Sequence, residues 1–136
     1  MTPHSASTVP VLRLGDILLT GLLSELDDRA AVSFGRELTE RIADAFTRGV
    51  LIDISRLEII DSFVARTLME ITAMARLMGA RVIVAGMRPA VAVTLVELGL
   101  ELTGVETAVH AEQAMAVLGW HSSQQPLEGA LDDTAS

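Results

Sequence analysis

An acidic turn that ends in a serine is the part of this sequence best suited to chemistry. The segment from Leu51 to Val64 reads LIDISRLEIIDSFV, in which an apolar run leads to Asp61 and Ser62. A serine in this position can cap a helix through its side-chain oxygen, or it can accept a phosphate on its hydroxyl. If Asp61 supplies the cap instead, Ser62 falls in the first helical turn with its hydroxyl free. On the residues alone the cap is the favoured role of Ser62, because most serines in this position only cap a helix.

The carboxylates of Asp53, Glu58 and Asp61 could also form a catalytic centre, because sites in open α/β sheets form at the carboxyl ends of strands. They lack a partner base, since the chain contains no lysine and no cysteine. The three histidines show no metal-pair spacing and are interpreted as surface or terminal residues; they are His4, His110 and His121. A solvated acidic loop is therefore the favoured interpretation, with no catalytic residue, metal or cofactor.

The composition indicates one domain with an aliphatic core. Half of the 136 residues are hydrophobic, but only three Phe and one Trp are present, so Leu, Val, Ile, Ala and Met must fill the interior. The net charge is −8 and all ten basic residues are arginine, which argues against binding to nucleic acid or to an anionic membrane. We see no leader sequence and no apolar run near the length of a membrane-spanning helix, so we expect a cytoplasmic protein.

The elements that must position Ser62 alternate along the chain. Strands are predicted at Val9 to Leu14, Ile17 to Gly21, Val50 to Ile54, Arg81 to Gly86 and, weakly, Val105 to Val109. Helices are predicted from the Asp27 cap to near Gly49, from Ser62 to Gly79, from Pro89 to Leu98 and from Ala111 to Leu118. This order predicts an α/β fold with a mixed, mostly parallel sheet of about five strands and about four helices.

Apolar stripes at three- and four-residue spacing mark the core-facing sides of two helices. The stripes are Ala31, Phe34, Leu38, Ile42 and Ala45, then Val64, Leu68, Ile71, Ala75 and Met78. The helix after Pro89 is apolar on nearly all sides, which either core packing or a partner surface would explain. Residues 1–8 and 120–136 are predicted to be flexible ends of a domain that spans 9–119, although Trp120 could fold back onto it.

Several segments of the chain resemble the STAS domain, the fold of anti-sigma-factor antagonists. The Asp-Ser-Phe element at positions 61–63 is shared by many proteins of that family. The longer segment from Gly86 to Gly99 narrows the resemblance to RsbS-like scaffolds of the bacterial stressosome. The other matching segments are 9–14, 25–29, 59–65, 78–82 and 106–108.

The resemblance implies a single-domain STAS scaffold without catalytic activity. Ser62 would be phosphorylated by an RsbT-like serine kinase, and Asp61, Phe63 and Glu58 would flank this switch and contact partners. The scaffold would assemble with RsbR-like paralogues into a large homo- or hetero-oligomer, release the kinase on phosphorylation and be reset by an RsbX-like phosphatase. Thr94 matches, in type and place, a second phosphorylated threonine of the paralogues.

Two other functions remain open at this point. A simple anti-sigma-factor antagonist would bind one anti-sigma kinase as a monomer and use the same Ser62 switch, so the size of the assembly separates it from a scaffold. A small α/β enzyme would use Asp53, Glu58 and Asp61, and would bind a metal or a substrate at that edge.

Overall fold

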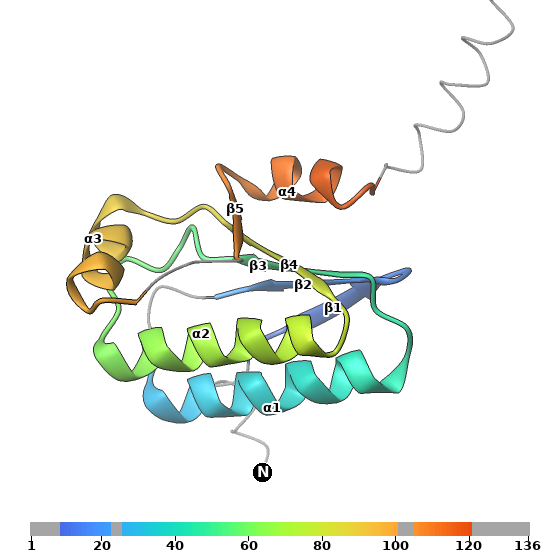
Figure 1. Cartoon of the computed structure of the whole chain (residues 1–136), viewed down its shortest axis with the longest axis horizontal. Helices are drawn as coiled ribbons and strands as arrows, with labels where there is room; N and C mark the ends of the chain where they lie inside the picture. Colours follow the sequence, from blue (N-terminus) through green and yellow to red (C-terminus); the bar gives the residue numbers. More distant parts are fainter. Residues whose placement is uncertain (1–8, 23–25, 101–104, 121–136) are drawn as a thin grey trace, which may run out of the picture.

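The computed structural model of the protein describes residues 9–22, 26–100 and 105–120. Within these ranges strands and helices alternate as predicted, and the α/β fold with five strands and four helices is confirmed (Figure 1). The elements are β1 (Val11–Leu14), β2 (Ile17–Gly21), α1 (Asp28–Asp44), β3 (Gly49–Asp53), α2 (Ser62–Leu77), β4 (Arg81–Ala85), α3 (Pro89–Glu97), β5 (Glu106–Ala108) and α4 (Ala111–Val117).

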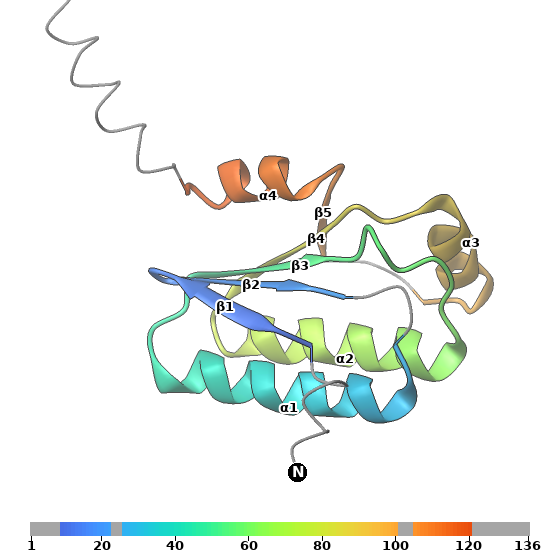
Figure 2. The ribbon, with the colours of Figure 1, turned by 180° about the vertical axis from the view of Figure 1, so that it is seen from behind.

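The five strands form one mixed sheet whose order in space is the order in sequence, β1-β2-β3-β4-β5. The β1–β2 hairpin is antiparallel, with Leu12 opposite Leu19, and the other neighbours are parallel. Helices α1 and α2 cover one face of the sheet and α4 covers the other, as the views from both sides show (Figures 1 and 2). The start of α2 and the whole of α3 lie at the edge where β3 and β4 end (Figure 1).

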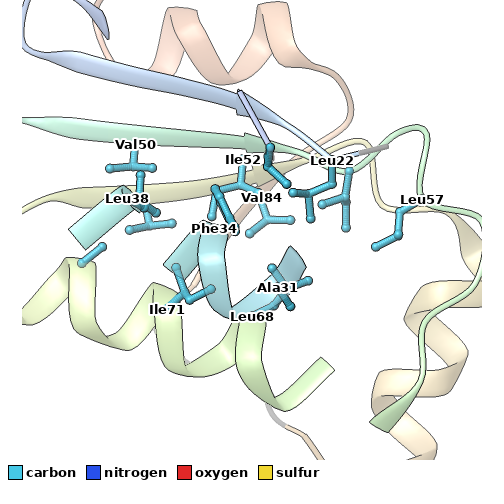
Figure 3. Close-up of a cluster of buried hydrophobic side chains, with 14 of the residues drawn as sticks. Leu22, Ala31, Phe34, Leu38, Val50, Ile52, Leu57, Leu68, Ile71 and Val84 are labelled. Carbon is cyan, nitrogen blue, oxygen red and sulfur yellow. The ribbon is translucent and has the colours of Figure 1, made fainter. Parts of the chain in front are cut away.

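Two apolar clusters fill the space on either side of the sheet. The larger one packs α1 and α2 against it, with Phe34 and Ile71 among the buried side chains (Figure 3). The smaller one lies under α4 and contains Leu51 and Leu118. Successive residues of β3 point to opposite faces, so Val50 enters the larger cluster while Leu51 enters the smaller. This double burial explains the nearly continuous apolar run in β3.

Helix α1 ends earlier than the sequence predicts. It stops at Asp44; Ala45 is extended and exposed, so its assignment to the apolar stripe is wrong. Gly49 does not terminate the helix, because it is the first residue of β3. Thr47 in the loop after the helix is buried, and its hydroxyl accepts a hydrogen bond from Arg13 at 2.9 Å, which anchors this loop.

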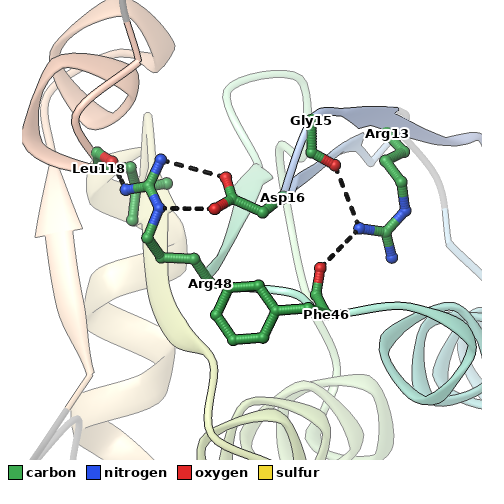
Figure 4. A network of polar contacts seen from close by, with 6 residues as sticks. All are labelled: Arg13, Gly15, Asp16, Phe46, Arg48 and Leu118. Carbon is green, nitrogen blue, oxygen red and sulfur yellow. Dashed lines mark hydrogen bonds and ion pairs between the residues drawn. The ribbon is translucent and has the colours of Figure 1, made fainter.

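Two arginines join the loops at the sheet edge opposite to Ser62 (Figure 4). Arg13 donates to the Phe46 carbonyl at 3.2 Å. Arg48 donates to the Asp16 carboxylate at 3.0 Å and also to the Leu118 carbonyl. The hydrogen bond from Arg48 holds the pKa of the Asp16 carboxyl below its usual value. The hairpin, the start of β3 and the end of α4 are therefore held together by charged groups rather than by packing alone.

The apolar residues at the ends of α2 and α4 differ in burial. Met78 is exposed at the end of α2, so its assignment to the second apolar stripe is wrong. Trp120 is half-buried against the cluster under α4, and its backbone N–H donates to the Met115 carbonyl at 2.9 Å. Trp120 therefore folds back onto the domain, while the predicted flexible segments 1–8 and 121–136 lie outside the described residues.

Candidate functional site

Helix α2 begins at the carboxyl edge of the sheet with Asp61 as its N-cap. Asp61 has an extended backbone, and its Oδ1 atom accepts a hydrogen bond from the Val64 N–H at 2.8 Å. Cap residues satisfy backbone donors that the first helical turn would otherwise leave unpaired. The cap that the sequence offers to either residue is therefore taken by Asp61, and Ser62 is the first residue of the helix.

The Ser62 side chain is exposed, and its hydroxyl makes no hydrogen bond to any residue that the structure describes. Val64 and Ala65, which follow Phe63, are buried in the core and fix the start of the helix. Ser62 is thus an accessible hydroxyl on a well-anchored backbone. A phosphoryl group could be added to it without breaking an existing side-chain bond, and would bring a charge of roughly −1.5 to −2 at pH 7.

A groove of about 530 Å³ runs between α1 and α2 and starts at Ser62; we call it the α1–α2 groove. Its α1 side consists of Ala31, Val32 and Gly35, and its α2 side of Ser62, Phe63, Arg66, Thr67, Glu70, Ile71 and Met74. The helices approach closely at Gly35, where a Cβ atom would lie 3.1 Å from the Ile71 side chain. The Phe63 side chain is 45% exposed, so an apolar surface lies directly beside the Ser62 hydroxyl.

The three carboxylates before Ser62 do not converge on one point that could hold a metal ion. Asp53 accepts a hydrogen bond from the Ser55 N–H at 2.9 Å and so shapes the turn after β3, whereas Asp61 caps α2. Glu58 is exposed in the loop between them. Asp53 and Asp61 each have a separate local role, and Glu58 faces solvent.

Thr94 lies on α3, outside the α1–α2 groove. Thr94 is half-buried as a residue, and its hydroxyl donates to the Ala90 carbonyl at 3.0 Å, one turn earlier. Its hydroxyl is therefore already bonded, unlike that of Ser62. The apolar strip on this helix has two faces: Val91 is buried in the core, while Val96 is 76% exposed. Core packing accounts for the first face and leaves the second as open apolar surface.

Arg66 is a groove residue that was not predicted from the sequence. It is exposed and lies four residues after Ser62 on the same helix. Residues at this spacing are neighbours on a helix surface. The spacing was visible in the sequence and could have pointed to Arg66 once Ser62 was placed in the first turn.

The sequence of residues 9–112 matches the STAS domain family over most of the chain. The chain belongs to the STAS domain family. This STAS domain is also similar in structure to the Ser-to-Glu variant of RsbS from Moorella thermoacetica: the TM-score is 0.75 and the identity 38%, over 82% of this chain and 94% of that one. It is also similar to a chain in a solved structure that describes the molecular architecture of the stressosome, a signal integration and transduction hub. The TM-score is 0.73 and the identity 38%, over 81% of this chain and 96% of that one.

Among curated proteins, this STAS domain is 32% identical over 103 residues to the RsbT co-antagonist protein RsbRA of Bacillus subtilis (strain 168). The match covers 76% of this chain but only 37% of RsbRA, and a second co-antagonist, RsbRD, is matched over 41% of its length. The chain therefore spans about two-fifths of the length of these relatives. Its similarity to RsbS and RsbR proteins supports a place for this domain among the anti-sigma antagonists and stressosome scaffolds. None of these relatives is named for an enzymatic activity. No helix in the described ranges is both long and apolar enough to cross a membrane.

Proposed function

We propose that this STAS domain is a non-enzymatic scaffold of a bacterial stressosome that is switched by phosphorylation of Ser62. Its similarity to RsbS and RsbR proteins supports the stressosome context. The observation that carries the switch is the exposed, unbonded hydroxyl of Ser62 on a helix that Asp61 already caps. A serine needed as the cap would lose a structural contact on modification, but this one does not.

In this proposal the unmodified scaffold holds an RsbT-like serine kinase in the cytoplasm, together with RsbR-like paralogues. The kinase contacts Phe63 at the mouth of the α1–α2 groove, with Glu58 and Asp61 at its border. Phosphorylation places about two negative charges beside this apolar contact. Burying this added charge in an apolar interface is costly, so the kinase is released. An RsbX-like phosphatase removes the phosphate and restores binding.

Mass spectrometry of the full-length chain after incubation with ATP and an RsbT-like kinase from the same genome tests the modification. We expect one phosphate on Ser62, its loss in Ser62→Ala and its retention in Thr94→Ala. The Thr94 variant is a matched control because its hydroxyl is bonded to the Ala90 carbonyl. A chain that stays unmodified while the kinase phosphorylates a control substrate would contradict the switch and leave Ser62 as a surface serine.

Light scattering of the chain, alone and mixed with an RsbR-like paralogue, tests the scaffold role. A large particle supports the stressosome assignment. A monomer under both conditions, with Ser62 still phosphorylated, would instead support a simple anti-sigma-factor antagonist.

A further inference from the structure

We propose that Arg66 binds the phosphate of phosphorylated Ser62 and holds it across the mouth of the α1–α2 groove. This inference rests on the proposed function, since it requires a phosphate on Ser62. It extends the proposed function by naming the residue that binds the phosphate and the direction in which the phosphate turns.

The spacing of the two residues carries the proposal. Ser62 and Arg66 both lie on α2 and both line the α1–α2 groove. Side chains four residues apart on a helix have Cβ atoms about 5–6 Å from each other, and the favourable order places the anion before the cation. A guanidinium group presents a planar fork of donors that matches two phosphate oxygens.

Arg66 is available for this contact. Its side chain is exposed, and it forms no ion pair with any residue of the described part of the chain. Among the residues that the structure describes, it is the only basic one that lines the groove, and those on the α1 side are uncharged. A phosphate that turns toward the groove therefore meets one cation, and that cation is Arg66.

Three acidic residues influence this contact, two in its favour and one against it. Asp61 and Glu58 are not among the residues that line the groove, so their charges repel a phosphate that turns away from it and favour the orientation toward Arg66. Glu70 lines the groove one turn after Arg66 and can attract the same guanidinium. Its single charge follows the cation along the helix, which is the weaker order, whereas the phosphate carries nearly two charges and precedes the cation.

The contact would change the surface that a partner meets. Phe63 stands between the two residues in sequence and lines the same groove. A phosphate paired with Arg66 places a charged bridge beside the surface on which a partner side chain would pack against Phe63. The pair thus fixes the added charge over the apolar contact, rather than leaving it to move freely in solvent.

The test uses the full-length chain with phosphoserine incorporated at position 62 during translation, so its outcome does not depend on any kinase. A pH titration followed by ³¹P NMR reports the second pKa of the phosphate, which a nearby cation lowers by favouring the dianion. We expect Arg66→Gln to raise this pKa by about 0.3, the change expected when a pair of this spacing is removed. Arg36→Gln, which removes an exposed arginine of α1 that does not line the groove, should leave it unchanged.

An unchanged phosphate pKa in Arg66→Gln, with a circular dichroism spectrum that shows the variant folded, would overturn the proposal. Equal increases in the Arg66 and Arg36 variants would also overturn it, because they would report only the loss of one positive charge. If the kinase fails to modify Ser62 while the titration reveals the pair, the proposed function fails and the inference about Arg66 stands. The two ideas are thereby tested separately.

Discussion

Gly86 and Ser55 lie against each other where β4 ends beside the loop that leads to Ser62. A Cβ atom on Gly86 would lie 2.7 Å from the Ser55 Cβ atom, and Gly86 has a φ of 77°, which disfavours other residues. The Gly86 N–H also donates to the Ala108 carbonyl at 3.0 Å, so the backbone is fixed at this point. Arg88 donates to the Ser55 carbonyl at 2.8 Å and holds the loop from the other side.

Replacing Gly86 with alanine should destabilise the fold more than the same change at Gly99. Gly99 has a similar φ of 72°, but an added Cβ atom would meet no atom of the described residues within 4 Å. Gly99→Ala therefore measures backbone strain alone and should cost about 1 kcal/mol, while Gly86→Ala should cost about 2–3 kcal/mol. Urea unfolding gives both free energies. Equal losses would show that the contact with Ser55 relaxes without cost.

The caps of α1 and α2 should contribute similar stability but differ in their effect on phosphorylation. Asp27 accepts a hydrogen bond from the Ala30 N–H at 2.7 Å, as Asp61 does from Val64. Asp61→Ala and Asp27→Ala should each lower the free energy of unfolding by about 1 kcal/mol. In Asp61→Ala the Ser62 hydroxyl becomes the nearest replacement cap, so the rate of Ser62 phosphorylation should fall. If Asp27→Ala changed the rate of Ser62 phosphorylation equally, the effect would come from lost stability alone.

Removing the apolar side chain beside Ser62 should weaken kinase binding. Phe63 is 45% exposed at the mouth of the groove, whereas Val96 is 76% exposed on α3. Phe63→Ser should reduce the affinity for the RsbT-like kinase by about tenfold or more, as expected for an aromatic contact residue, and Val96→Ser should not. Calorimetric titration of each variant with the kinase provides the comparison. The reverse pattern would assign the kinase to the exposed face of α3.

Acid should destabilise the domain in part through two surface ion pairs. Hydrogen bonds from Arg48 and Arg81 lower the pKa of Asp16 and Glu106, respectively. A carboxyl whose pKa is lower in the folded state stabilises the fold above its unfolded pKa, and this contribution is lost as the pH falls through the folded pKa. The free energy of unfolding should therefore fall below about pH 4.

The double variant Asp16→Asn, Glu106→Gln should show a shallower fall in the same urea measurements at each pH. The Asp16 and Glu106 side chains are 38% and 41% exposed, so solvent screens both pairs and the difference should be small. A slope identical to that of the parent chain would assign acid sensitivity to other carboxylates.

Much of this fold could be predicted because most of its elements carry their own signals. The buried run of β3 and the stripe containing Leu68 and Ile71 followed directly from periodicity. The end of α1 could not be read in this way. The loop that follows it is anchored by the bond between Arg13 and Thr47, residues 34 positions apart, and spacing rules consider only neighbours along the chain.

The site divides in the same manner. Asp61 and Ser62 were found from sequence, and the structure decides which of them is the cap. Phosphorylation of Ser62, and of Thr94, stays a prediction. The groove was not foreseen, because its shape comes from the close approach of two helices at Gly35 and Ile71.

The strand order has a consequence for how the chain is made. Each strand after the first lies beside the strand that preceded it, and none is inserted between two earlier ones. A chain that leaves the ribosome from its amino end can therefore add strands to a growing edge as they emerge, since no earlier pairing has to open. Helix α4 comes last and places Leu118 against Gly49 at the start of β3. The Ser62 segment is thus synthesised, and can be folded against α1, before the opposite face of the sheet is covered.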